Sequence, residues 1–247
     1  MRFSNIFKVL FVFCFIHEVS ASEKLTIAVA SNFLFPAKEL SAEFEQRENV
    51  KIKLVSASTA KLYAQIRQGA PFDLFLSADK ATVKKLVDQG FILPAHHFIY
   101  AKGQLVLWAP SHSDAKMALR NTVYNRIAIA NPKLAPYGKA AFESLKFMGL
   151  MEPYKNKIIY AENVSQAFQY VFHRNVDAAL IAYSQLKLKD IENSYWIIPV
   201  GYYAPIEQHG GLLEQARSKV FAKKYLEYLT SDEIKKKIVT DFGYANY

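Results

Sequence analysis

Short apolar runs alternate along the chain with segments in which apolar residues recur every three or four positions. The short runs predict strands, and the longer spacing predicts one buried face of a helix. The predicted strands cover residues 25–30, 50–55, 72–77, 105–108, 126–130, 157–160, 177–182 and 195–199. The predicted helices contain residues 37–44, 62–66, 83–87, 141–148, 168–172, 221–229 and 234–242. The stretch between Gly90 and Leu105 is expected to be rich in turns.

Repeated alternation of strands and helices predicts an α/β fold with mostly parallel or mixed sheets flanked by helices. Two such series follow one another, so we expect two lobes. The predicted first part of lobe 1 is residues 22–103, lobe 2 is residues 104–204, and residues 205–247 return to lobe 1 with the C-terminal helices. The chain should cross between the lobes near residues 101–105 and 203–208.

The first residues have the pattern of a secretory signal. Arg2 and Lys8 provide positive charge, residues 9–16 are apolar, and small residues end at Ala21. The apolar run is shorter than the ~20 residues that span a bilayer. The sequence therefore predicts a signal peptide over residues 1–21, cleaved after Ala21, with an uncleaved membrane anchor as the alternative.

Composition narrows the class further. Of the 247 residues, 51% are hydrophobic and 21% charged, which excludes an intrinsically disordered chain. The single Cys excludes a disulfide scaffold and a multi-cysteine metal site. The net charge of +9 suits nucleic acid, an anionic membrane, anionic small ligands or simply solvated lysines. Since exported proteins rarely meet nucleic acid, we expect no nucleic-acid partner.

Polar residues follow several predicted strands at the points where helices begin. Ser31 follows the first strand, Ser58 and Thr59 follow the second, and Tyr183 follows the strand ending at Ala182. Two further helix starts contain Pro136-Tyr137-Gly138 and Asn163-Val164-Ser165. Ligands of open α/β sheets bind at these strand ends, and helix starts offer free N–H groups to anions. The alternative is that the Ser and Asn residues are ordinary helix caps and that Tyr183 belongs to the core.

The residues at these positions resemble a known family. Residues 28–32, 58–66 and the run Gly69-Ala-Pro-Phe-Asp-Leu-Phe-Leu-Ser-Ala-Asp79 resemble the periplasmic molybdate-binding proteins of ABC importers, the ModA family. The segments 131–138, 161–164, 182–183 and 242–244 continue the resemblance in the same order. It covers essentially all of the chain after the predicted signal.

The resemblance implies a two-lobe type II binding-protein fold with a tetrahedral oxyanion in the cleft between the lobes. It implies a monomeric periplasmic protein, without cofactor or protein-ligated metal ion, that gives molybdate, and also tungstate, to an ABC permease in the inner membrane. The implied ligand contacts are Ser31, Thr59, Tyr137, Val164 and Tyr183, with Ser58 and Asn32 as secondary candidates.

Two positions depart from the family pattern. The chain has Ala57-Ser-Thr-Ala60 where the family often has Gly-Ser-Ser-Gly, so Thr59 adds a methyl group to a tight cavity. Tyr137 stands where a small residue is common, and its amide can serve the ligand only if its ring points away.

Other functions have weaker support. The chain has neither a Gly-x-Ser-x-Gly nor a His-Glu-x-x-His motif, and His96-His97 has no nearby carboxylate, so we expect no enzyme. The ligand-sensing half of a transcription regulator would need a helix-turn-helix segment and no export signal. The main alternative is the same fold binding another anion, such as sulfate, phosphate or a small organic acid.

Overall fold

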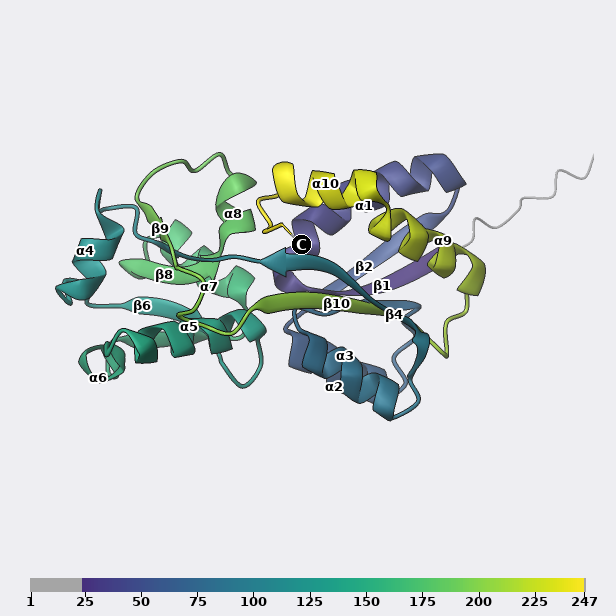
Figure 1. Ribbon diagram of the computed structural model, residues 1–247, viewed down its shortest axis with the longest axis horizontal. Helices are drawn as coiled ribbons and strands as arrows, with labels where there is room; N and C mark the ends of the chain where they lie inside the picture. Colours follow the sequence, from purple (N-terminus) through teal and green to yellow (C-terminus); the bar gives the residue numbers. More distant parts are fainter. Residues whose placement is uncertain (1–23, 247) are drawn as a thin grey trace, which may run out of the picture.

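Two five-stranded sheets flanked by helices form the two halves of the protein in a computed structural model that describes residues 24–246 (Figure 1). This arrangement confirms the predicted α/β fold. The predicted signal peptide, residues 1–21, lies outside the described residues. Between residues 24 and 246 there is no helix with the length and apolar character needed to cross a bilayer.

The first sheet has the strand order β2-β1-β3-β10-β4. Its strands are β1 (Lys24–Ala30), β2 (Lys51–Ala57), β3 (Leu74–Leu76), β4 (Ile92–Gly103) and β10 (Ile206–Leu213). Strand β1 runs parallel to β2 and β3, whereas β10 runs antiparallel to both β3 and β4. The carboxyl ends of β1, β2 and β3 therefore meet at one edge of the sheet.

Helices cover both faces of the first sheet. The elements that accompany it are η1 (Ser31–Phe33), α1 (Leu34–Glu48), α2 (Thr59–Arg67), α3 (Lys80–Asp88), α9 (Lys219–Thr230) and α10 (Asp232–Thr240). Helices α1, α9 and α10 lie above the sheet in Figure 1, and α2 and α3 lie below it. Strand β1 serves both cores, because Ile27 packs toward α1 and Ala28 packs toward α2.

The second sheet has the order β7-β6-β8-β5-β9 and a single continuous core. Its strands are β5 (Leu105–Trp108), β6 (Ile127–Ala130), β7 (Ile158–Ala161), β8 (Ala178–Ala182) and β9 (Tyr195–Ile197). Its helices are α4 (Ala115–Arg120), α5 (Pro136–Phe147), α6 (Met151–Tyr154), α7 (Val164–Phe172) and α8 (Tyr183–Lys187). Strand β6 runs parallel to β7 and β8, and β5 runs antiparallel to β8 and β9.

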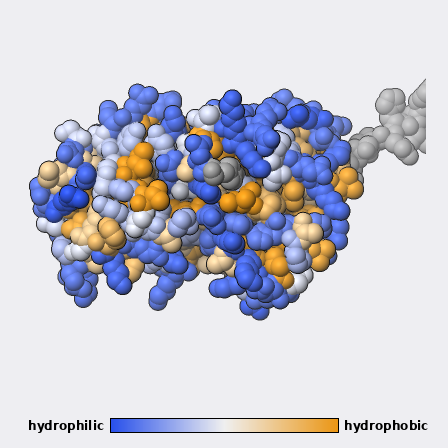
Figure 2. Space-filling model, viewed as in Figure 1, coloured by the Kyte–Doolittle hydropathy of each residue, from blue (hydrophilic) through white to orange (hydrophobic). Residues whose placement is uncertain are grey.

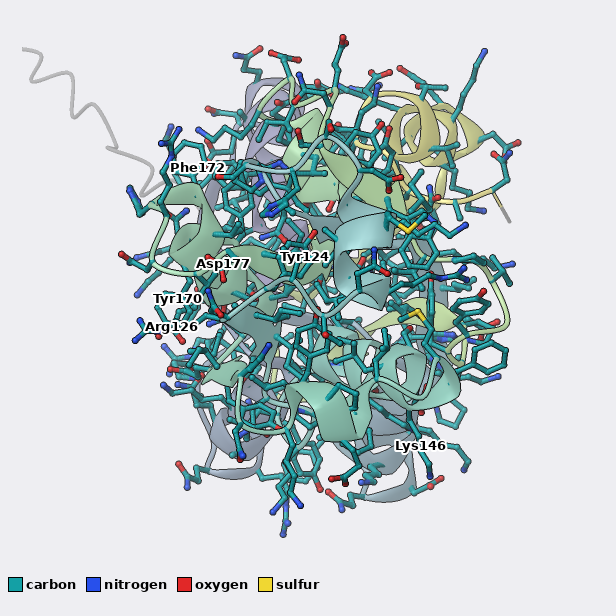
Figure 3. All side chains as sticks on the ribbon, turned by 90° about the vertical axis from the view of Figure 1, so that its left-hand side faces the viewer. Tyr124, Arg126, Lys146, Tyr170, Phe172 and Asp177 are labelled. Carbon is teal, nitrogen blue, oxygen red and sulfur yellow. The ribbon has the colours of Figure 1, made fainter. Side chains whose placement is uncertain are left out.

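The outer end of the second half is held by polar contacts, and Figure 3 looks directly onto it. The Asp177 carboxylate accepts hydrogen bonds from the backbone N–H groups of Asn125 (2.7 Å) and Arg126 (2.9 Å). It thereby joins the chain before β6 to the chain before β8. The face of the molecule in Figure 2 is mainly hydrophilic, with apolar residues in small separate groups, because most apolar side chains lie in the cores.

The expectation of a turn-rich stretch before Leu105 is wrong, because β4 occupies most of it. Strand β10 was not predicted either. Pro94 and the polar pair His96-His97 interrupt the apolar pattern of β4, and Gly210-Gly211 have low strand propensity. The two strands stabilise each other through long-range antiparallel pairing, which no local pattern reveals.

The chain passes between the two sheets at two neighbouring places. It leaves β4 at Gly103 and enters β5 at Leu105, and it returns between Ile197 of β9 and Ile206 of β10. Gly103 and Ile206 are paired, so the two connections lie side by side. The division into residues 22–103, 104–204 and 205–247 stays a prediction.

Candidate anion-binding site

A small cavity lies where the two halves meet, at the carboxyl ends of strands from both sheets. It encloses about 190 Å³, part of which is open to solvent. Its walls are formed by Ala30, Ser31, Asn32, Ser58, Thr59, Ala78, Ala135, Pro136, Tyr137 and Val164. The structure thus brings together four of the five predicted ligand contacts and both secondary candidates. None of the lining residues is charged.

Ser58 precedes α2 at the N-cap position, yet its side chain does not cap the helix. Its Oγ is buried and has no hydrogen-bond partner in the structure. Asp79 and Asn163, by contrast, do cap, accepting from Thr82 N at 2.6 Å and Gln166 N at 3.0 Å. A buried hydroxyl without a partner costs about 1–3 kcal/mol. The alternative of an ordinary cap therefore does not describe Ser58, whose hydroxyl is available to a ligand.

Thr59 begins α2 and contributes both an amide and a hydroxyl to the cavity. A first-turn N–H has no acceptor within its own helix. The Thr59 Oγ1 accepts a hydrogen bond from Ala78 N at 3.2 Å. Because a hydroxyl has one hydrogen and two lone pairs, its own hydrogen can still be donated to a ligand.

Tyr137 lies in the first turn of α5, after Pro136 at the start of the helix. Its ring extends out of the cavity toward the connection between the lobes, where its hydroxyl accepts from Gln208 Nε2 at 3.3 Å. A Cβ atom on Gly103 would lie 2.2 Å from this hydroxyl, so only glycine leaves room for the ring. The ring therefore points away from the cavity. This orientation is the one required if the backbone N–H of Tyr137 is to donate to a ligand. Burial raises the pKa of the Tyr137 hydroxyl well above its usual value.

The start of α5 also depends on Gly138. A Cβ atom at this position would lie 2.1 Å from the carbonyl oxygen of Ala130, at the end of β6. The absence of a side chain lets the first turn of α5 approach the strand end closely. Gly138 thus helps to position the backbone N–H of the neighbouring Tyr137.

The second half contributes a further helix start at Val164, the first residue of α7, where Asn163 is the cap. Ser165 does not cap α7 and instead donates its hydroxyl to the Ser31 carbonyl in the first half at 2.9 Å. Two other contacts join the halves at the rim: Ala60 N donates to Leu134 O at 3.1 Å, and Lys61 pairs with Glu162 at 3.1 Å.

Tyr183, the fifth predicted contact, does not line the cavity. Its ring lies 5.7 Å from the ring of Tyr195, centroid to centroid, and it packs beside Gly243. A hydrogen bond to Tyr183, followed by burial, raises the pKa of Tyr195. Tyr183 as a ligand therefore stays a prediction.

A larger groove adjoins the cavity and shares Thr59, Ala78, Ala135 and Pro136 with it. The groove holds about 1070 Å³, including open solvent. Its charged lining residues are Lys80, Lys85, Lys133 and Lys139, with Asp79, Glu143 and Glu207. The sequence patterns did not predict this groove, because its residues come from α2, α3, α5 and the return connection.

A buried polar network behind the cavity was also missed. It contains Asn32, Tyr100, Tyr137, Gln208 and Tyr244. Gln208 and Tyr100 had no signal, since both of their strands were unpredicted. Within residues 24–246, no three His, Cys, Asp or Glu side chains gather as a metal-binding group.

Comparison with known proteins decides the family. The family model "Bacterial extracellular solute-binding protein" matches residues 25–245. The molybdate-binding protein ModA of Rhodobacter capsulatus is 37% identical over 228 residues, covering 92% of this chain and 90% of the relative. The chain belongs to the ModA family. A second ModA protein, from Azotobacter vinelandii, is 34% identical over 90% of both chains.

A solved ModA structure supports the same assignment. The Azotobacter vinelandii periplasmic molybdate-binding protein superimposes with a TM-score of 0.85 at 32% identity, covering 90% of this chain and 99% of that one. The resemblance to the ModA family and the two-lobe type II binding-protein fold are thereby confirmed.

Proposed function

We propose that this protein binds molybdate outside the cytoplasm, binds tungstate as well, and delivers the oxyanion to an ABC permease in the inner membrane. Two relatives with more than 30% identity bear the name molybdate-binding protein, and a solved structure from Azotobacter vinelandii has the same description. The proposal uses the cavity between the two halves as the ligand site.

The uncharged lining of the cavity is the observation that carries the proposal. The N-termini of α2, α5 and α7 face one small space. Their free first-turn N–H groups and the positive ends of their helix dipoles suit an anion. Each hydrogen bond to a charged ligand contributes about 1.5–3 kcal/mol, so several can hold a dianion without a cationic side chain. Fixed neutral donors select by size. A cavity fitted to molybdate also fits tungstate and holds the smaller sulfate loosely.

The proposed contacts follow from the walls of the cavity. Ser31, Ser58 and Thr59 would donate hydroxyl groups, and the amides of Ser31, Thr59, Tyr137 and Val164 would donate from the backbone. Asn32 stays a secondary candidate, because its side chain is engaged with Gln208 and Tyr244. Tyr183 joins this set only if its ring leaves Tyr195.

Isothermal titration with molybdate, tungstate, sulfate and phosphate tests the proposal. We expect molybdate and tungstate to bind with micromolar or tighter affinity and to raise the melting temperature. Sulfate and phosphate at equal concentration should do much less. Tight binding of sulfate or phosphate, with none of molybdate, would instead establish the alternative ligand class.

We further propose that the protein is a monomer without catalytic activity, cofactor or nucleic-acid partner, and that it is periplasmic after cleavage behind Ala21. Membership of an extracellular solute-binding family supports the location. Mass spectrometry of the exported protein should give a chain starting at Ser22, and light scattering should give the mass of one chain with and without molybdate.

A further inference from the structure

Gln208 is a fully buried polar residue at the connection between the two halves. It lies on β10, pairs with Ala101 of β4, and stands two residues from the Ile206–Gly103 pair where β10 begins. Figure 1 shows β4 and β10 side by side where they approach the second half. A buried amide must satisfy both its carbonyl oxygen and its NH₂ group, so its partners are informative.

The two ends of the Gln208 amide contact the two halves of the protein. Its Oε1 accepts a hydrogen bond from Asn32 Nδ2 at 2.9 Å, in the first half. Its Nε2 donates to the Tyr137 hydroxyl at 3.3 Å, in the second half. Asn32 and Tyr137 both line the anion cavity, one on each side. Gln208 itself does not line the cavity, so it acts on the ligand through these two residues.

A β-bulge brings a third partner to Gln208. Gln208 pairs with Ala101 but His209 pairs with Ile99, so Tyr100 is an extra residue on β4. Bulges redirect side chains and are frequent next to functional sites. The Tyr100 hydroxyl lies 3.0 Å from Gln208 Oε1 and 2.9 Å from the Ser77 carbonyl oxygen. The Gln208 Oε1 atom thus accepts from Asn32 and also faces the Tyr100 hydroxyl, whose single hydrogen is shared with the Ser77 backbone carbonyl oxygen.

Asn32 is held from a further direction. The Tyr244 hydroxyl donates to the backbone carbonyl oxygen of Asn32 at 3.1 Å and accepts from Asn32 Nδ2 at 3.2 Å. Asn32 directly follows Ser31, so its orientation sets the position of the Ser31 amide and hydroxyl. The ring of Tyr137 is held by Gln208 and fits into the space above Gly103. The fixed ring in turn fixes the position of the Tyr137 backbone N–H.

We propose that Gln208 is a positioning residue that aligns the donors of the two lobes around the oxyanion, and thereby determines its size selectivity. The inference rests on the proposed function of the cavity. Gln208 holds one wall of the cavity with each end of a single planar amide, so the distance between the walls depends on this side chain. Loss of the amide loosens both walls together.

The test compares Gln208→Met, Tyr137→Phe, the double variant and a control. Methionine matches glutamine in length but lacks the donor and acceptor. Tyr137→Phe removes only the hydroxyl. Tyr225→Phe is the matched control, because Tyr225 is also fully buried and its hydroxyl pairs with Ser41 Oγ at 3.1 Å, away from the cavity.

For Gln208→Met we expect the Kd for molybdate to rise about tenfold, a value typical of one to two lost hydrogen bonds. The ratio of the sulfate and molybdate dissociation constants should shrink. Tyr137→Phe should give a smaller change in the same direction, and the double variant should fall short of the product of the single effects. Tyr225→Phe should lower the melting temperature and leave the Kd unchanged. Unchanged selectivity in both Gln208→Met and Tyr137→Phe overturns the proposal.

Amide hydrogen exchange separates this inference from the proposed function. In Gln208→Met without ligand, peptides covering residues 31–33 and 137–141 should exchange faster together, whereas Tyr225→Phe should leave both unchanged. This coupling is measurable even if the unsubstituted protein binds no molybdate, a result that would reject the proposed function alone. Unchanged exchange in both peptides overturns the positioning role even if molybdate binds.

Discussion

The anion cavity and the groove beside it share four residues but differ in charge. The cavity is lined by hydroxyls, amides and apolar groups, and the groove carries four lysines and three acidic residues. A lysine inside the cavity would attract any small anion, whereas fixed neutral donors discriminate by the positions of the ligand oxygens. Lysines outside it would raise the local concentration of anions and so act on the association rate. The difference teaches that one surface can select among anions while a neighbouring surface attracts them.

Among the variants that alter the cavity, Gly138→Ala should have the largest effect. The new Cβ collides with the Ala130 carbonyl oxygen, so the start of α5 must move away from the cavity. We expect molybdate binding to weaken by about 3 kcal/mol, because each amide bond to a charged ligand contributes about 1.5–3 kcal/mol. Calorimetry measures the change. Gly149→Ala, just beyond the other end of α5, should lower stability and leave the affinity unchanged, and equal losses in both variants would refute the argument.

Ser31→Ala and Ser58→Ala should each weaken binding by about 1–3 kcal/mol through the loss of one donor to the anion. Ser58→Ala should not lower the melting temperature without ligand, because its Oγ has no partner to lose. Ser231→Ala is the matched control. Its hydroxyl caps α10, so it should cost about 1 kcal/mol of stability with no change in affinity. A Ser58→Ala protein with unaltered affinity would remove Ser58 from the site.

The groove side of the comparison is tested by replacing Lys80, Lys133 and Lys139 with Gln. We expect a severalfold slower association with molybdate at low salt, with an unchanged dissociation rate, measured by stopped-flow fluorescence. The difference should disappear at high ionic strength, where the Debye length is short. Lys219, Lys223 and Lys236, on α9 and α10, provide a control with the same loss of charge. If the control slows association as much, net charge rather than the groove is responsible.

The smallest expected effect concerns the pair formed by His97 and His209, whose ring nitrogens lie 2.7 Å apart. Burial lowers the pKa of both, Lys80 lowers both further, and Glu207 partly opposes the effect at His209. A histidine with a lowered folded-state pKa is neutral in both states above about pH 6.5, so full stability is present there. As the pH falls below 6.5, the unfolded chain takes up protons first and stability declines.

Thermal melting between pH 7.5 and pH 5.5 should therefore show a decrease of a few degrees that His209→Gln reduces. Lys80→Gln should reduce it as well, since a positive neighbour of the pair is removed, and this links the pair to the lysine-lined groove. A melting temperature that is independent of pH in this range would contradict the assignment.

The sequence predicted those parts of the fold that rely on local pattern. Strands β6 and β8 are continuous apolar runs and β1 is mainly apolar, and the cavity residues Ser31, Ser58 and Thr59 stand where strands give way to helices. Tyr137 and Val164 came from the family resemblance as well as from helix starts. Strands β4 and β10 escaped prediction because they stabilise each other across more than a hundred residues of chain. Gln208 escaped with them, since its role depends on contacts with Asn32 and Tyr137 that only the folded chain creates.

The space above Gly103 has an evolutionary consequence. The phenol of Tyr137 lies where a Cβ atom on residue 103 would stand, so each residue restricts what the other can be. A relative with a small residue in place of Tyr137 would lack this hydroxyl, so a Cβ atom in place of Gly103 would meet only the Gln208 amide, 3.0 Å away. The two positions should therefore covary across the family, with the aromatic side chain and the bare backbone inherited as a pair.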